Sequence, residues 1–109
     1  MRAMTAALLL ALATTATAEP TPAQKQALDF IKANMGPLIH DGVWTSDRNL
    51  KLGVLAGDSD EWDGVALGIC ALLRDRGAAP PMTVVHMVDI VKLLARGSWV
   101  ELGRANCSR

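Results

Sequence analysis

Residues 83–96 read Thr-Val-Val-His-Met-Val-Asp-Ile-Val-Lys-Leu-Leu-Ala-Arg, and this stretch decides the fold predicted for the chain. On a helical projection, apolar residues cover most of its circumference. The polar residues form one seam at steps of three and four: His86, Asp89, Lys92 and Arg96. Thr83 is a suitable N-cap, and Gly97 is a suitable stop. The β-branched residues also permit a strand, but the length and the caps favour a helix at the centre of a bundle.

Three further segments carry helix signals. Two of them begin at capping boxes, at residues 21–24 and 58–61, and end near Gly36 and Gly77. A third box at residues 98–101 predicts a short last helix.

Residues 37–57 carry the weakest signal. Leu50, Leu52 and Val54 alternate as in a strand, whereas Leu50, Val54 and Leu55 would share one face of a helix. We expect a short helix, because no other segment offers a partner strand. The sequence therefore predicts an all-α fold, a small orthogonal bundle of four or five helices stapled by one disulfide.

Residues 82–94 resemble the last long helix of small exported immunity proteins that neutralise amidase effectors. The resemblance covers thirteen residues without a diagnostic motif, and the cysteine pattern around it differs. It implies a helix here and assigns no functional residue.

The first eighteen residues predict export. Arg2 precedes an apolar run over residues 6–13, and the triplet at 16–18 offers small residues to a signal peptidase. The run is shorter than the roughly 20 residues that span a bilayer. We therefore expect a cleaved signal peptide at residues 1–18 and no membrane anchor after cleavage. Residues 19–109 are then a single helical domain in the periplasm or outside the cell.

The cysteine pair supports this location. Cys70 and Cys107 are the two cysteines of the chain, and both lie beyond the predicted cleavage site. In an oxidising compartment such a pair favours a disulfide. A redox role is less favoured, because no C-x-x-C motif lowers the pKa of either thiol.

Composition and motifs limit the class of function. The chain carries 11 basic and 11 acidic residues, which gives no electrostatic footprint for nucleic acid. It has no G-x-S-x-G elbow and no glycine-rich phosphate loop, so we expect neither catalysis nor a cofactor. The acidic run at residues 58–63 lacks EF-hand spacing and is interpreted as helix capping. The expected partner is another protein, with a homodimer as the alternative.

Two groups of residues are candidates for binding. Trp44 and Trp62 are candidate partner contacts, although an indole in so small a domain also serves as a lid over the core. Gly64 and Gly68, four residues apart, predict a flat groove that another helix could approach.

The second group could sense pH or bind metal. His86 and Asp89 would share one face of the predicted helix, and His40 could join them if the fold brings it near. The plainer interpretation is a solvated seam and a loop histidine.

These observations lead to two hypotheses. The first is an exported helical protein-interaction module without catalytic activity, chaperone-like or inhibitor- and immunity-like. The alternative is a periplasmic carrier of a small molecule or metal ion, with a pocket between helices near His40, His86 and Trp44.

Overall fold

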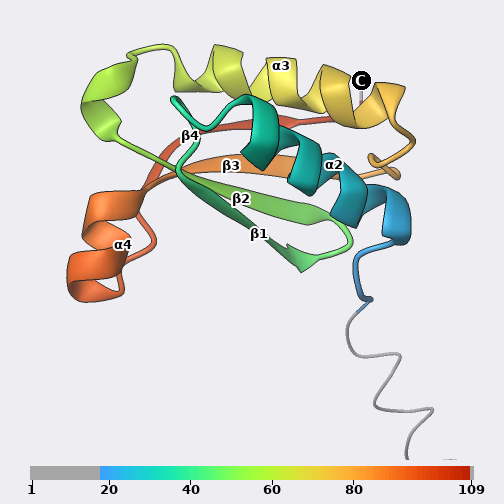
Figure 1. Ribbon diagram of the computed structural model, residues 1–109, viewed down its shortest axis with the longest axis horizontal. Helices are drawn as coiled ribbons and strands as arrows, with labels where there is room; N and C mark the ends of the chain where they lie inside the picture. The colour runs from blue at the N-terminus through green and yellow to red at the C-terminus, as the bar shows by residue number, and fades with distance from the viewer. Residues whose placement is uncertain (1–17, 109) are drawn as a thin grey trace, which may run out of the picture.

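The computed structural model describes residues 18–108, which form a four-stranded mixed sheet and three α-helices (Figure 1). The elements in chain order are α2 (Pro22–Asn34), β1 (Asp41–Ser46), β2 (Asn49–Val54), the short 3-10 helix η1 (Ala56–Asp58), α3 (Trp62–Asp75), β3 (Val84–Asp89), α4 (Ile90–Arg96) and β4 (Glu101–Asn106). The predicted signal peptide falls on residues 1–18, of which 1–17 lie outside the described residues. No helix in the described part is long and apolar enough to cross a membrane.

The predicted all-α bundle is wrong, and the stretch at residues 83–96 shows why. Its first half is strand β3, and its second half is helix α4. Asp89 belongs to no polar seam, because it is the N-cap of α4 and accepts the N–H groups of Val91 at 3.0 Å and Lys92 at 3.2 Å. A central strand is buried on both faces, so its nearly continuous apolar run imitates that of a buried helix. The resemblance to a long immunity-protein helix fails for the same reason.

Two further helix predictions are wrong, because the segments concerned are strands that pair with β3 or with each other. Residues 37–57 contain the hairpin β1–β2, in which Leu50, Leu52 and Val54 all face the core. The box at residues 98–101 begins no helix, since Glu101 starts strand β4. The "single helical domain" is therefore an α/β domain.

The helices predicted to begin at residues 21 and 58 are present as α2 and α3, but the second capping box is not. Asp58 ends η1, and α3 begins only at Trp62, without a side-chain cap, so the interpretation of the acidic run at residues 58–63 as helix capping is wrong for Asp58. Thr21 forms the expected capping box with Gln24 at the start of α2. Helix α3 buries the expected face through five residues: Trp62, Ala66, Ile69, Cys70 and Leu73.

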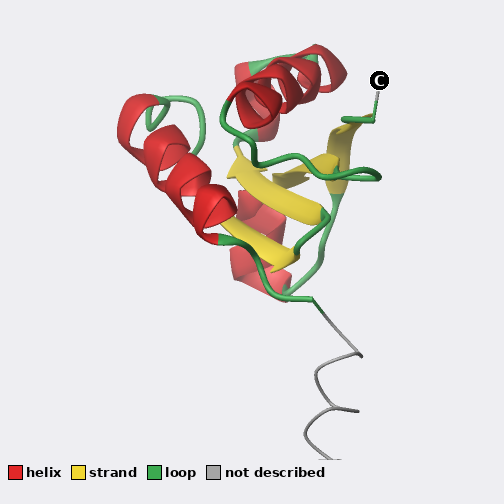
Figure 2. Cartoon of the chain, turned by 90° about the vertical axis from the view of Figure 1, so that its right-hand side faces the viewer, coloured by secondary structure: helices red, strands yellow, loops and turns green. Residues whose placement is uncertain are grey.

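The strand order is β1-β2-β3-β4, with β2 and β3 parallel and both outer pairs antiparallel. Helix α3 makes the crossover between the two parallel strands, as parallel pairing requires. Helices α2 and α3 contact each other against one face of the sheet (Figures 1 and 2). The hydrophobic core lies between these helices and that face.

Glycines let the helices approach this face. A Cβ atom on Gly42 would lie 2.8 Å from the Leu28 side chain of α2, and one on Gly103 would lie 2.7 Å from the backbone of Trp62 in α3. Asp63 adds a hydrogen bond of 2.9 Å to the Arg104 N–H on the outer strand β4. The first turn of α3 therefore sits directly on β4.

A buried glutamine joins three parts of the chain. The Gln24 side-chain amide donates to the carbonyl oxygens of Asp47 at 2.6 Å and Ala78 at 3.2 Å, while its oxygen accepts the Thr21 N–H. The Gln24 carbonyl also accepts the indole N–H of Trp44 at 2.9 Å. Because Gln24 is fully buried, these bonds satisfy groups that water cannot reach.

The predicted disulfide between Cys70 and Cys107 is present, with 5.1 Å between the Cα atoms and a sequence separation of 37. It fastens the residue after β4 to the middle of α3. Arg74 supports the same junction by donating to the Cys107 carbonyl at 3.2 Å. The disulfide therefore holds the end of strand β4 against α3, whereas the sequence predicted a helix in place of this strand.

Candidate functional site

The second face of the sheet is only partly covered, because α4 is the one described helix that packs there. A Cβ atom on Gly53 would lie 3.0 Å from the Cδ1 atom of Ile90, so α4 stands directly over β2. The Asp89 cap fixes the start of α4, and Gly97 ends it in the left-handed conformation at φ 69°. The helix is therefore short, capped at both ends and seated on the sheet.

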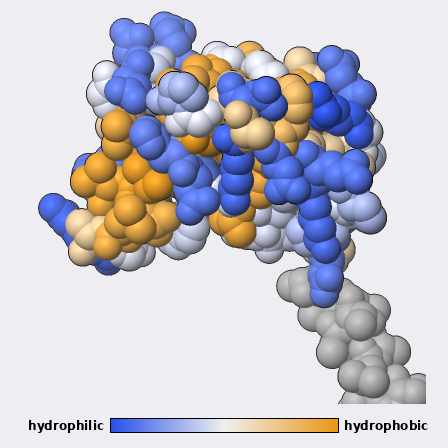
Figure 3. All heavy atoms as spheres, in the orientation of Figure 1, coloured by the Kyte–Doolittle hydropathy of each residue, from blue (hydrophilic) through white to orange (hydrophobic). Residues whose placement is uncertain are grey.

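Helix α4 exposes an unusual amount of apolar surface. Four of its seven residues are large aliphatics, yet none of the seven is buried. Val91 is 57% exposed and Leu94 is 80% exposed. Figure 3 shows hydrophobic residues gathered at the end of the molecule where α4 projects from the sheet.

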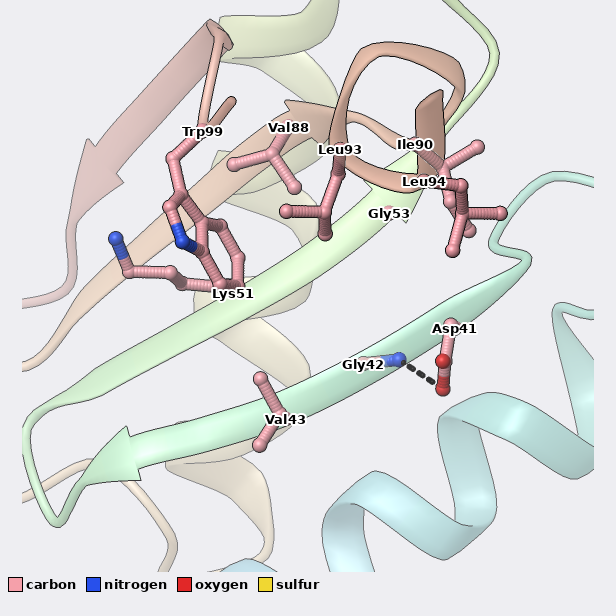
Figure 4. Close-up of a pocket in the computed structure, with 10 residues that line it drawn as sticks. All are labelled: Asp41, Gly42, Val43, Lys51, Gly53, Val88, Ile90, Leu93, Leu94 and Trp99. Carbon is pink, nitrogen blue, oxygen red and sulfur yellow. Dashed lines mark hydrogen bonds between the residues drawn. The ribbon is translucent and has the colours of Figure 1, made fainter. Parts of the chain in front are cut away.

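Side chains from the sheet and from the α4–β4 connection extend this apolar area. We call the α4 surface the set Val43, Val91, Leu93, Leu94 and Trp99. It contains four of the six large hydrophobic residues that are exposed in the described part of the chain. Val43, Val88, Leu93, Leu94 and Trp99 surround a hollow of about 70 Å³ above Gly53 (Figure 4).

Lys51 is the cation that lines the hollow. The Lys51 ammonium lies 4.9 Å from the centroid of the Trp99 ring, and Lys92 and Arg96 project from α4. Within residues 18–108, none of these three forms a salt bridge. The hollow is therefore mainly apolar, with Lys51 and Asp41 as its charged residues.

Two carboxylates on this side of the sheet have basic partners. Asp41 lies 3.6 Å from the Lys32 ammonium, and Glu101 contacts both His86 at 2.6 Å and Arg104 at 3.3 Å.

The structure separates the residues predicted to sense pH or bind metal. His86 points to the α4 side of the sheet, where Nδ1 pairs with Glu101 and Nε2 lies 3.0 Å from the Asn49 side-chain oxygen. Asp89 faces the other way and caps α4. His40 is exposed in the loop before β1 and is held by its backbone N–H, which donates to Gly53. Among residues 18–108 no group of three or more metal-ligating side chains converges.

The residues predicted to contact a partner lie outside the α4 surface. Trp44 is 7% exposed and Trp62 is 4% exposed, and their indoles donate to Gln24 and Ala56. Both therefore occupy the position of a core lid, which was the alternative interpretation. Gly64 and Gly68 lie on the exposed side of α3, and a Cβ atom on Gly68 would meet nothing within 4 Å. No described segment lies over this part of α3.

Sequence analysis missed the residues of the α4 surface. It placed Leu93 and Leu94 inside a central helix and Trp99 at the start of a last helix. One signal was present in the sequence: the four large aliphatics of residues 90–94 spread over nearly half of the helix circumference, so one contact face does not bury them all.

Comparison of the chain with protein-family models, curated proteins and solved structures finds no match.

Proposed function

We propose that this protein is an exported interaction module without catalytic activity, which binds another protein through the α4 surface. The observation that carries the proposal is α4 itself, a helix with four large aliphatics and no buried residue beside the half-exposed Trp99. Soluble monomers rarely expose contiguous apolar patches of this kind unless the patch binds something.

The composition of the surface supports a protein partner. Tryptophan is enriched among the residues that dominate binding energy, particularly beside pockets from which water is excluded. Burying the exposed parts of Val91, Leu94 and Trp99 would remove apolar area from water at about 25 cal/mol per Å². The caps of α4 and its contact with Gly53 hold the helix in place before binding. Binding therefore costs little further conformational entropy in this helix.

The hollow also fits a protein better than a carried ligand. Its volume of about 70 Å³ is well below the roughly 300–1,000 Å³ of small-molecule pockets. A space of this size accepts one inserted side chain. A second depression, of about 610 Å³, is lined by Phe30, Leu72, Asp75 and Arg76, and it does not contain His40, His86 or Trp44, the residues expected near the pocket of a carrier.

Site-specific photo-crosslinking in exporting cells tests the proposal. A benzophenone amino acid replaces Leu94 in one variant and Leu67 in the other, because Leu67 is also exposed, at 58%, but lies on α3. We expect a discrete adduct from position 94 and none from position 67. The same adduct should be lost when Trp99→Ser is added to the position-94 variant. Equal adducts from both positions, or an adduct that Trp99→Ser leaves intact, would count against the proposal.

A further inference from the structure

The α4 surface carries the features that two copies of one surface need in order to bind each other. Resting on the function proposed above, we propose that this surface binds a second copy of the chain across a two-fold axis. In the dimer, Leu94 of each copy packs against Trp99 of the other, and Lys51 of each copy faces Asp41 of the other.

The two ends of the hollow differ in shape and in charge. Trp99 and Lys51 lie at one end, with the Lys51 ammonium 4.9 Å from the ring centroid, whereas Leu94 and Asp41 lie at the other (Figure 4). Leu93 lies between the two ends. A two-fold axis near Leu93 exchanges the ends, so that each end of one copy meets the opposite end of the second copy.

The apolar contacts of this dimer join a protruding side chain to a recess. Leu94 is 80% exposed and stands at the edge of the hollow, which accepts one side chain. Trp99 remains 51% exposed although Lys51 lies against its ring. Because the axis repeats every contact, the dimer covers two leucines and two tryptophans at once. The surface thus offers both the inserted group and the space that receives it.

The charged contacts pair residues of opposite sign. Lys51 and Asp41 are the charged residues that line the hollow. Within residues 18–108 Lys51 forms no salt bridge, and Asp41 uses only Oδ1 for the Gly42 N–H and the Lys32 ammonium. The Asp41 side chain is 70% exposed, so Oδ2 can accept a second cation. Exchange of the two ends brings Lys51 of each copy opposite this carboxylate.

The same two charges make strongly charged occupants less suitable. Lys51 attracts an acidic segment or an anionic bilayer, but Asp41 repels it, and for a basic segment the reverse holds. A bilayer also offers no fixed side chain to the hollow. Lys92 and Arg96 do not line the hollow, so an axis through it does not set these like charges against each other there. A second copy supplies both opposite charges from the same two residues.

Sedimentation velocity of the disulfide-bonded protein over a range of concentrations tests this inference. We expect a monomer–dimer equilibrium that Leu94→Ser abolishes and Leu67→Ser leaves unchanged, since Leu67 is exposed on α3. Lys51→Glu and Asp41→Lys should each weaken dimerisation about tenfold, because each replaces two exposed ion pairs by like charges. Lys25→Glu, which reverses an exposed cation on α2, should leave dimerisation unchanged.

A mixture of the two charge variants tests the two-fold arrangement itself. Lys51→Glu and Asp41→Lys each place like charges at both contacts when alone, whereas a dimer of one with the other has opposite charges at both. We therefore expect the equimolar mixture to dimerise about as tightly as the unmodified protein. A substitution that merely damaged the fold would not be rescued by mixing.

The outcomes separate the two proposals. Three results would overturn the dimer: a monomer at every concentration, self-association that Leu94→Ser leaves intact, or charge variants that mixing does not rescue. A monomer whose position-94 crosslinker still captures a different protein would overturn the second copy and leave the interaction module standing. A monomer whose position-94 crosslinker captures nothing would count against both.

Discussion

Gly103→Ala should be among the most damaging single-methyl substitutions in this chain, because α3 rests on the β4 backbone at this point. The new Cβ atom would lie 2.7 Å from both the Trp62 carbonyl carbon and the Asp63 nitrogen. Non-bonded carbon atoms normally approach to about 3.5–4.0 Å. The first turn of α3 would therefore have to retreat by about 1 Å and stretch the hydrogen bond from Arg104 to Asp63.

Overpacking of a core costs about 1–3 kcal/mol. We expect about 3 kcal/mol here, because the obstructing atoms belong to a backbone that cannot change rotamer. In a domain of this size, that loss lowers Tm by about 12–24 °C. Thermal unfolding followed by far-UV circular dichroism measures the shift on the oxidised protein.

Gly68→Ala is the matched control, since it adds the same methyl group to an exposed site in α3 with nothing within 4 Å. It should stabilise the protein by about 1 kcal/mol, because alanine has the higher helix propensity. If Gly103→Ala unfolds at the wild-type temperature, α3 does not pack on β4 as described, and the reasoning is refuted.

Three further substitutions test the staple, the buried amide and the helix cap. Replacing Cys70 and Cys107 together by serine should lower the free energy of unfolding by about 4 kcal/mol in urea titrations, and a loss below about 1 kcal/mol would contradict the loop-entropy argument. Gln24→Leu leaves two buried carbonyls without their donor and should cost about 2–3 kcal/mol, so an unchanged urea midpoint would show that the amide is dispensable. Asp89→Ala removes the cap of α4, worth about 1 kcal/mol, and should speed hydrogen exchange at the Lys92 amide. Unaltered exchange there would mean that α4 needs no cap.

The parts of the fold that follow from local chemistry could be predicted from the sequence. The Thr21–Gln24 box and the buried face of α3 depend on residues within one or two turns of each other. The disulfide followed from the number of cysteines and the predicted export signal. Each of these features can be predicted without knowing which distant segments pack together.

The sheet could not be predicted in the same way, because its strands are defined by pairing across long stretches of chain. β2 meets β3 only after the α3 crossover, and β3 meets β4 only after α4. Asp89 ends a strand and caps a helix at once, so no turn residue separates the two elements. The apolar pattern therefore runs across the boundary without a break.

The candidate site could not be predicted from the sequence for a related reason. Residue type alone points to tryptophans and histidines as candidate site residues. Whether each is exposed, and which residue it contacts, depends on how the strands pair. Trp44 and Trp62 are buried, whereas Trp99 is half-exposed. His86 finds Glu101 fifteen residues away on the neighbouring strand.

Tryptophan fluorescence tests the central claim most directly, because Trp99 is 51% exposed whereas Trp44 and Trp62 are buried. The measurement is acrylamide quenching of the emission with and without a saturating amount of the protein captured by the position-94 crosslinker. We predict that binding abolishes the quenchable fraction and shifts the emission to the blue, with no such change in Trp99→Phe. A quenchable fraction that persists in the saturated complex would contradict binding through the α4 surface.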